Sequence, residues 1–357
     1  MNETMNKRWR EYFFLATALD PIHVGAGGYR LGRVDLTICR EPVSGIPKIP
    51  GTTMSGAIKF FADMALIDAG VKKEWCASTK GSDHDETHKS TCPICYAFGY
   101  TPKTGSQGQS RQGILDFGDA LLLLFPVRTM LGPVWVTSPG QLERLLGSGT
   151  VRPPEDEKKQ GETEHSEFKV VADKFALPSD SSLKTEVGRL RPSNHLNIGW
   201  LYLEKATKDA SFTARNLTDA GVEPVIADRT MLLPERLFEH VVNDQLEVRT
   251  SVAIDPTTGA ADEGALFTYE AVPRGAIFLT CIVVNDYSKG WKDIGKATTL
   301  NGRNLTEPIS LVEKAFNGLA AVGLGGMTTR GFGRLKLSPA KENAGLTSAA
   351  PGQEAGT

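Results

Sequence analysis

The most informative part of the sequence is Ile22-His23-Val24-Gly25-Ala26-Gly27-Gly28-Tyr29-Arg30-Leu31-Gly32-Arg33-Val34-Asp35, a loop rich in glycine and arginine. The apolar run at residues 12–19 predicts a buried strand in front of this loop, and Pro21 ends that strand. Residues 323–334, close to the other end of the chain, have the same character. Glycine lets the backbone approach a ligand closely, and arginine pairs with phosphate oxygens. We therefore expect the two loops to form one composite surface for a polyanion.

The composition is that of an ordinary globular protein. The chain has 357 residues, of which 40% are hydrophobic and 23% are charged, and its formal net charge is −2. A nucleic-acid site must therefore be a local basic patch, because the molecule as a whole has no basic field. The first ten residues lack the apolar region of a signal peptide, and no apolar run approaches the length of a membrane span. We expect a cytoplasmic protein with no membrane partner.

The pattern of apolar residues predicts strand, loop, strand, helix, insertions, hairpin, strand, helix, loop and strand. Residues 34–40 alternate as a second strand, and helical spacing begins near Thr52 or Thr53. The N-terminus of that helix would present N–H groups suited to phosphate. Residues 248–254 and 266–271 flank a Pro/Gly turn and predict a hairpin. This order indicates an α+β fold with an RRM-like or ferredoxin-like core and large insertions.

We expect six segments, in which the hairpin of residues 246–274 could be either a protruding thumb or a structural meander. The segments are residues 1–74, the first part of an RRM-like palm with its glycine-rich loop; 75–112, a small zinc-binding insertion and a flexible loop; 113–245, palm and lid insertions; 246–274, a protruding thumb hairpin; 275–337, the completion of the palm with the C-terminal glycine-rich loop; and 338–357, a disordered tail. Within them, residues 196–203 predict one strand and residues 309–319 one helix.

A metal site is indicated by cysteines and histidines at metal-ligand spacing. The odd count of five cysteines, three of them clustered, argues against a disulfide framework. The segment contains little apolar sequence, so we expect a structural Zn²⁺ to replace a core of its own. Four ligands suffice for tetrahedral zinc, so one histidine is spare; the alternatives are free cysteines in a loop and a catalytic zinc. The candidate ligands are Cys76, His84, His88, Cys92 and Cys95.

Asp35 is the candidate for chemistry. A carboxylate with an ordinary pKa near 4 is a weak proton acceptor at neutral pH, so its plausible roles are to hold a divalent ion or to orient an attacking hydroxyl. His23 is close in sequence and could assist. The alternatives are a turn-forming aspartate and an ion-pair partner. The glycine-rich loop itself fits neither the P-loop nor the dinucleotide fingerprint, and could be a tight turn.

Several motifs, taken in order, resemble a known family. They are His23-Val24-Gly25-Ala26-Gly27, Asp35, Arg40-Glu41, Ile49-Pro50-Gly51-Thr52-Thr53 and Gly325-Gly326-Met327-Thr328-Thr329-Arg330-Gly331-Phe332-Gly333-Arg334. Together they resemble the RAMP-superfamily backbone subunits of type III CRISPR–Cas effector complexes. Residues 119–128, 135–137 and 249–273 are most similar to the type III-B (Cmr) subunit, whereas Cys92-Pro93-Ile94-Cys95 is similar to the type III-A (Csm) subunit.

The resemblance implies a function. Copies of the chain would stack along a CRISPR RNA beside other type III effector subunits, and each thumb would wedge into the guide–target duplex. Asp35, with His23 assisting, would then promote cleavage of the target RNA at regular intervals by attack of its own 2′-hydroxyl, with Mg²⁺ or Mn²⁺ as cofactor. The first alternative is a non-catalytic RNA-binding assembly subunit of the same complex. The second is a free-standing zinc-dependent nuclease.

RNA contacts are expected from both loops and from the start of the first helix. The family has a basic residue in that helix where this chain has Ser55, and Lys59, one turn later, is the expected substitute. The expected RNA-binding residues are Gly25, Gly27, Arg33, Arg40, Thr52, Thr53, Lys59, Gly325, Gly326, Thr328, Thr329, Arg330 and Arg334.

Overall fold

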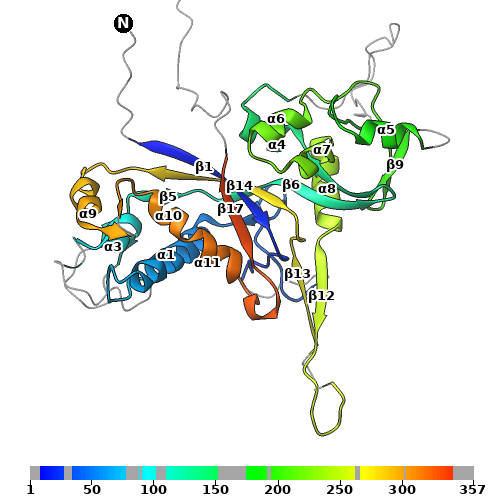
Figure 1. Ribbon diagram of the computed structural model, residues 1–357. Helices are drawn as coiled ribbons and strands as arrows, with labels where there is room; N and C mark the ends of the chain where they lie inside the picture. The colour runs from blue at the N-terminus through cyan, green and yellow to red at the C-terminus, as the bar shows by residue number, and fades with distance from the viewer. Residues whose placement is uncertain are drawn as a thin grey trace, which may run out of the picture.

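A large sheet lies at the centre of a mixed α+β fold (Figure 1). The computed structural model describes residues 9–27, 34–77, 88, 91–101, 110–151, 174–190, 194–261, 266–300 and 303–340. The main path of the sheet has the order β11-β7-β6-β14-β1-β17. These strands are β11 (Thr230–Leu232), β7 (Gly132–Thr137), β6 (Ala120–Thr129), β14 (Ile277–Val284), β1 (Arg10–Ala18) and β17 (Leu335–Pro339). Two short strands join at the side: β2 (Lys48–Ile49) pairs with β6, and β5 (Leu115–Phe117) pairs with β14.

Strand β1 is central because it pairs on both edges. It runs antiparallel to β14 and antiparallel to β17, so the first and last described strands are neighbours. Its side chains alternate between the two faces, as strand geometry requires. Phe14 and Ala16 belong to one buried cluster, and Leu15 belongs to the other. The strand is therefore buried on both faces, which explains why its sequence is almost continuously apolar.

Helices cover both faces of the sheet. On one face α1 (Gly51–Asp68) packs with α10 (Ser310–Lys314) and α11 (Phe316–Ala321). On the other face the cluster around Leu15, Leu123 and Leu279 is completed by residues of α4 (Pro139–Leu146), α6 (Ala214–Asp219) and α7 (Pro224–Asp228). The two clusters give the sheet a core on each side.

The remaining elements form two groups at opposite ends of the sheet (Figure 1). One group contains β8 (Lys174–Phe175), β9 (His195–Ile198), β10 (Leu201–Lys205), α5 (Leu183–Gly188) and α8 (Glu235–Asp244). The other contains α3 (Pro93–Phe98), β3 (Gly99–Tyr100), β4 (Arg111–Gln112), α9 (Trp291–Ala297), β15 (Thr299–Leu300) and β16 (Arg303–Asn304). A short 3₁₀ helix, η2 (Thr328–Arg330), lies in the C-terminal glycine-rich loop.

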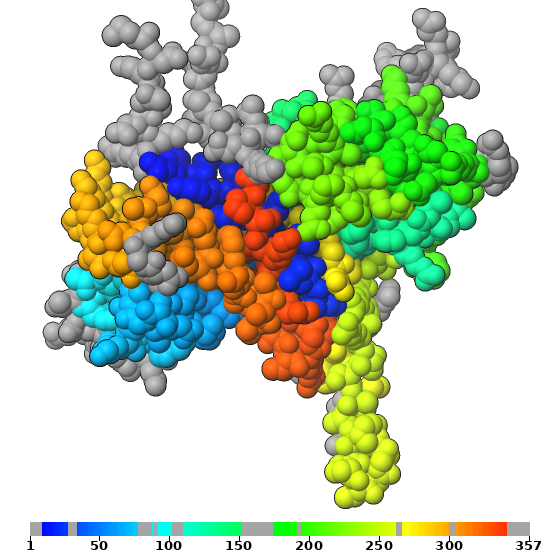
Figure 2. All heavy atoms as spheres, in the orientation of Figure 1, coloured from blue at the N-terminus to red at the C-terminus, as the bar shows by residue number. Residues whose placement is uncertain are grey.

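A two-stranded hairpin projects from the body. Strands β12 (Glu247–Ser251) and β13 (Phe267–Ala271) pair antiparallel, and an isolated bridge joins Ile254 to Ala261 farther along. Figure 2 shows the outer part of the hairpin standing clear of the rest of the molecule. Asp255 organises its outer turn, where its side chain accepts a 2.8 Å hydrogen bond from the Thr257 N–H. This aspartate therefore keeps an exposed turn in one conformation.

Three local predictions were wrong. Residues 34–40 make isolated bridges rather than a regular strand, because their partners, among them Gly25, Pro47 and Tyr269, come from different segments. Residues 196–203 are a hairpin that turns at Gly199, whose φ of 60° bends the chain. Residues 309–319 give two short helices instead of one. The described residues of the cysteine segment share the main core, in which Ile94 is fully buried.

The described part of the chain contains no helix with the length and apolar character needed to cross a membrane.

Candidate nucleic-acid interface and metal centre

The two glycine-rich loops meet. The Gly326 N–H donates a 2.8 Å hydrogen bond to the His23 carbonyl, and the Gly333 N–H donates a 2.9 Å bond to the Pro21 carbonyl. Figure 2 shows the two segments side by side at the root of the hairpin. The pairing of β1 with β17 brings the loops together, because one loop follows β1 and the other precedes β17. The predicted meeting of the two loops is therefore confirmed, and binding of a polyanion to them stays a prediction.

Glycine is required where the loops touch. Gly325 has a φ of 82°, and a Cβ atom there would lie 2.5 Å from the His23 carbonyl oxygen. Gly333 has a φ of 90°, and a Cβ atom there would lie 2.2 Å from the Leu324 carbonyl oxygen. Both positions combine a backbone conformation that L residues avoid with contact against backbone that cannot move aside. The glycines are thus needed to join the loops, whatever they bind.

His23 lies behind the joined loops. It is 5% exposed, and its Nδ1 lies 2.7 Å from the Glu270 carbonyl. A carbonyl oxygen only accepts, so Nδ1 carries the proton. The ring meets Tyr269 edge-on at 6.2 Å, and Gly326 packs against it. These contacts fasten the N-terminal loop to β13 and favour a positioning role for His23 over direct contact with a substrate.

Asp35 is exposed at the root of the hairpin. Its Oδ2 accepts hydrogen bonds from the Thr268 N–H at 2.6 Å and from the Thr268 hydroxyl at 2.9 Å. These bonds lower the pKa of Asp35 below its ordinary value, and the bond from the Thr268 backbone N–H contributes most to the shift. The side chain is therefore a fixed, ionised carboxylate at neutral pH, held by β13 and facing solvent.

Glu270 is a site residue that the sequence analysis missed. It is 7% exposed, accepts a 2.9 Å hydrogen bond from the Ile38 N–H and forms a 2.8 Å ion pair with Arg40. One buried carboxylate thus attaches the segment after Asp35 to the hairpin. A buried charge needs such partners to offset its desolvation. The only signal in the sequence was an acidic residue between two apolar positions of a strand, which is weak.

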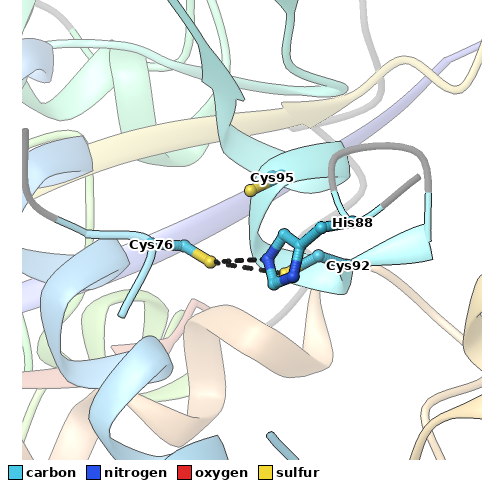
Figure 3. A group of neighbouring side chains, drawn as sticks. All are labelled: Cys76, His88, Cys92 and Cys95. Carbon is cyan, nitrogen blue, oxygen red and sulfur yellow. Dashed lines mark hydrogen bonds between the residues drawn. The ribbon is translucent and has the colours of Figure 1, made fainter. Parts of the chain in front are cut away.

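A compact group of four side chains could hold a metal ion (Figure 3). The ligand atoms of Cys76, His88, Cys92 and Cys95 all lie within 4.8 Å of one another. The Cys76 and Cys92 sulfurs are 3.6 Å apart, and the Cys76 sulfur is 3.2 Å from His88 Nε2. Ligands about 2.3 Å from a tetrahedral ion lie about 3.7 Å from one another, so this group fits such an ion.

The metal-ligand group is attached to α1 by a buried ion pair. Asp63, which is 0% exposed, accepts hydrogen bonds from the N–H groups of Cys76 at 2.7 Å and Ala77 at 2.8 Å, and also pairs with Lys72. Lys72 in turn donates a 2.9 Å hydrogen bond to the Cys76 sulfur. This cation offsets negative charge on the thiolates, and the carboxylate fixes the Cys76 backbone, as outer groups around metal sites commonly do.

A family model supplies the identity of the fold. The model described as the RAMP superfamily matches residues 15–336. The chain belongs to the RAMP superfamily. The match includes both glycine-rich loops, the hairpin and the metal-ligand group, so every candidate site lies inside the RAMP region.

The chain is also similar to individual proteins, at 26% sequence identity or below. The chain is 26% identical over 274 residues, 76% of its length and 80% of the relative, to the CRISPR system Cmr endoribonuclease Cmr4 of Pyrococcus furiosus. A cryo-EM structure described as Type III-B Cmr-beta in its apo state has a TM-score of 0.56 at 19% identity, covering 93% of this chain and 98% of that chain. A second, of Type III-B Cmr-beta bound to cognate target RNA, has a TM-score of 0.55 at 19% identity, covering 92% and 97%. The structural likeness concerns the fold.

Three predicted RNA-binding cations of this RAMP chain have internal partners. Arg40 binds Glu270, the Gly45 carbonyl at 3.1 Å and Asn243. Arg334 forms a two-pronged ion pair with Asp20 at 2.5 and 2.9 Å. Lys59 donates a 3.1 Å hydrogen bond to the Gly99 carbonyl. These charges hold the fold together and are less available to phosphate than the sequence indicated.

The expected anion site at the start of α1 is also partly filled. The Asp119 carboxylate accepts a 2.8 Å hydrogen bond from the Gly51 N–H and a 2.6 Å bond from Lys48. The helix begins at Gly51, with Pro50 as its N-cap, close to the expected start at Thr52 or Thr53, and Thr52 is exposed. The first N–H group of the helix therefore already has an anionic partner.

Some of the expected RNA-binding residues are exposed to solvent beside the hairpin. Gly25, Gly27, Thr329 and Arg330 are exposed, Thr328 and Thr53 are half-buried, and Arg330 reaches the Ser251 hydroxyl at 3.5 Å. Arg33 and His84 lie outside the described residues. Among the expected ligands, the structure gathers His88 with the three cysteines.

Proposed function

We propose that this chain is a CRISPR RNA-binding backbone subunit of a type III-B effector complex, where it cleaves guide-paired target RNA at regular intervals. The observation that carries the proposal is the exposed, ionised Asp35, held against the hairpin root beside the joined loops. The name of the Cmr4 relative supports the endoribonuclease activity. The expected partners are CRISPR RNA, target RNA, further copies of this chain and other type III subunits.

We assign Asp35 to positioning and charge rather than to proton removal. A carboxylate with a lowered pKa is a poor general base at neutral pH. Thr268 binds Oδ2 and leaves Oδ1 outside those bonds, so Oδ1 can orient an attacking 2′-hydroxyl or bind a cation. Mg²⁺ or Mn²⁺ at this carboxylate would stabilise the charge that develops on the phosphate. His23 then acts by holding the loop that carries the reacting group in place.

The β12–β13 hairpin is proposed as the thumb that separates guide and target. Between Thr250 and Pro273 it contains no lysine or arginine. It exposes Val252 at 41%, Ile254 at 55% and Leu266 at 65%. Apolar side chains that enter a base stack unstack and kink a duplex, whereas phosphate contacts require cations. The hairpin therefore has the surface of a wedge, and unpairing a nucleotide beside Asp35 would give the splayed geometry that in-line attack needs.

The palm is proposed as a ferredoxin-like core. Strands β1, β6, β14 and β17, with α1 after the first and α10–α11 before the last, have the sheet order β17-β1-β14-β6, all antiparallel. A split βαβ repeat has this connectivity. The six segments proposed from the sequence place the insertions between these core elements.

The metal-ligand group is proposed as a structural zinc site. Three cysteines and one histidine satisfy tetrahedral zinc. Cys76, Cys92 and Cys95 are buried and His88 is half-buried, and among the described residues these four side chains alone complete a tetrahedral set. Its role would be to hold residues 76–95 against α1 and the main core. This arrangement opposes the alternative of a zinc-dependent nuclease.

The decisive experiment uses assembled complexes. Complexes are purified with a defined guide, the bound RNA is extracted and sized, and cleavage of a matching target is followed at nucleotide resolution. We expect cuts at a constant spacing that vanish in Asp35→Ala, while guide content and target binding stay normal. Uniform cutting by complexes of Asp35→Ala would leave only the non-catalytic assembly role. A monomer that carries no RNA would contradict both.

A further inference from the structure

A tryptophan side chain is exposed to solvent at the tip of the β9–β10 turn. Trp200 is 88% exposed, although burial of so large a ring is favourable. The turn is a two-residue loop between the paired residues Ile198 and Leu201, with Gly199 at a φ of 60°. Such a turn has few conformations, so the ring is presented from a rigid base. An exposed ring on a rigid turn is what a stacking partner requires.

The turn is fastened to its surroundings by backbone contacts. The Gly199 N–H donates a 3.3 Å hydrogen bond to the Arg128 carbonyl, and the Met130 N–H donates a 2.9 Å bond to the Asn197 side chain. On the adjacent strand Tyr202 is 63% exposed, and its ring stacks on His195 with 5.0 Å between centroids. The β9–β10 hairpin and the β6–β7 turn therefore form one rigid surface with exposed aromatic rings.

A basic groove lies at the same turn. It has a volume of about 510 Å³ and is lined by the end of β6, the start of β7 and the pair Pro273–Arg274. Arg128 and Arg274 are exposed, and within the part of the chain that the structure describes neither guanidinium has a hydrogen bond or an ion pair within 4 Å. No acidic residue lines the groove, although the hydrogen bond from Arg334 and, to a smaller extent, the charge of Arg274 lower the pKa of Asp20. The groove thus offers two exposed cations, and the carbonyl of one of them, Arg128, accepts the hydrogen bond from Gly199, the residue before Trp200.

The groove is continuous with the root of the hairpin. Val272 pairs with Ile22, one residue before His23, and Arg274 follows two residues later. Arg274 is six residues from Thr268, the hydrogen-bond partner of Asp35. Six residues of extended chain span at most about 20 Å. A strand that passes Asp35 could therefore extend into the groove after a few nucleotides.

We propose that Trp200, Arg128 and Arg274 form a contact for a single-stranded segment of RNA, in which a base stacks on the indole and adjacent phosphates pair with the two guanidiniums. The inference rests on the proposed RNA-binding function and adds a subsite outside the glycine-rich loops. Planar rings with unpaired arginines suit nucleic acid, since every base has a face for stacking and every phosphate accepts a guanidinium fork. A protein partner would need acidic groups placed over both arginines, whereas an RNA strand has a phosphate at every nucleotide, so RNA is the occupant that we favour.

The test measures binding of a fluorescent oligouridylate to the full chain by polarisation. Removing one stacking ring weakens binding of a single strand by about 5- to 100-fold. We expect Trp200→Ala to lose affinity in this range, Trp200→Phe to retain most of it, and Arg128→Gln/Arg274→Gln to lower the salt slope by about 1.4. The controls are Tyr287→Ala, an aromatic residue 62% exposed near α9, and Arg215→Gln, both with unchanged affinity.

A second measurement locates the contact. Target and guide RNAs carrying single 5-iodouridines are irradiated in the assembled complex, and crosslinked peptides are identified by mass spectrometry. We expect crosslinks to Trp200 or Tyr202 at recurring RNA positions. Normal affinity in Trp200→Ala together with no such crosslink would overturn the proposal. So would loss of self-association without RNA at unchanged RNA affinity, because the surface would then be a contact between copies.

The outcomes separate this subsite from the proposed catalysis. Trp200→Ala is judged by its affinity for the oligouridylate, a measurement that requires no cleavage. If Asp35→Ala retains cutting, the catalytic assignment fails while the effect of Trp200→Ala on affinity still decides the subsite.

Discussion

The N–H of Gly326 donates a 2.8 Å hydrogen bond to the carbonyl of His23, which joins the loops from the two ends of the chain. The same His23 is held through its ring by the Glu270 carbonyl on the hairpin. One residue thus connects both loops to the hairpin root where Asp35 lies. The geometry of the proposed site depends on this junction.

Gly325→Ala should break the junction. The new Cβ atom would lie 2.5 Å from the His23 carbonyl oxygen. Gly331→Ala is the matched control, because Gly331 has a similar φ of 81° with nothing within 4 Å of the added carbon. We expect Gly331→Ala to cost about 1–2 kcal/mol of unfolding free energy from backbone strain, and Gly325→Ala about 3 kcal/mol or more. Denaturant unfolding measures both; equal losses would show that the contact with His23 is unimportant.

The cleavage rate should not depend on protonation of Asp35 at neutral pH. The pKa of Asp35 lies below its ordinary 3.8, because Thr268 donates to the charged form. The stabilisation from these bonds is therefore present above the unfolded pKa and is lost only as pH falls through the lower folded value. A single-turnover pH–rate profile should show no acidic limb from this group above about pH 5. The control is Asp219→Asn, which alters an exposed aspartate of α6 and should leave the profile unchanged.

An acidic limb above about pH 5 that moves in Asp35→Glu would contradict the assignment of Asp35 as a permanently ionised group.

Removing one cysteine ligand should release the metal. Cys92→Ser should reduce the metal content below one ion per chain and lower Tm by several degrees, because the ligand set becomes incomplete. Cys281→Ser is the control: burial raises the pKa of its thiol to about 11, and it lies outside the metal-ligand group. Elemental analysis and calorimetry measure the effects. Normal metal content in Cys92→Ser would remove this residue from the ligand set.

The buried pair Asp63–Lys72 should matter far more than an exposed pair. Their side chains are 0% and 9% exposed, and removing one partner of such a pair costs about 3–5 kcal/mol. Asp63→Asn should also release metal to a chelator faster, because the Cys76 backbone loses its acceptor. The control is Lys184→Met in the pair Lys184–Asp209, which is about one-third exposed and should cost below about 1 kcal/mol. If a chelator removed the metal as fast from Lys184→Met as from Asp63→Asn, a specific role of the Asp63–Lys72 pair at the metal-ligand group would be refuted.

The hairpin stem should act through its apolar surface. Replacing Val252, Ile254 and Leu266 by threonine should slow target cutting at least tenfold and leave guide content unchanged, because the wedge no longer gains from entering the base stack. Val43→Thr changes a fully exposed valine elsewhere and should have no effect. Cutting is followed by gel at saturating target. Unimpaired cutting in the triple variant would assign unstacking to another element.

Features encoded by local pattern were predictable. The strand before the first loop and α1 follow from spacing of apolar residues, and the gathering of Cys76, Cys92 and Cys95 follows from metal-ligand spacing. The zinc assignment itself stays a prediction. Asp35 was singled out for its chemistry, and it is exposed beside the joined loops.

Partners distant in sequence were not predictable. Arg40 and Arg334 looked like RNA contacts until Glu270 and Asp20 were found beside them, and His23 looked reactive until it was found buried. Trp200 was expected inside a strand, yet Gly199 turns the chain and leaves the ring in water. Composition and periodicity thus indicate many of the segments that form elements and the residue types that have chemistry to offer. Which charges remain available depends on strand pairing across the whole chain, because a hydrogen bond or ion pair is satisfied by whatever the fold brings within about 3 Å.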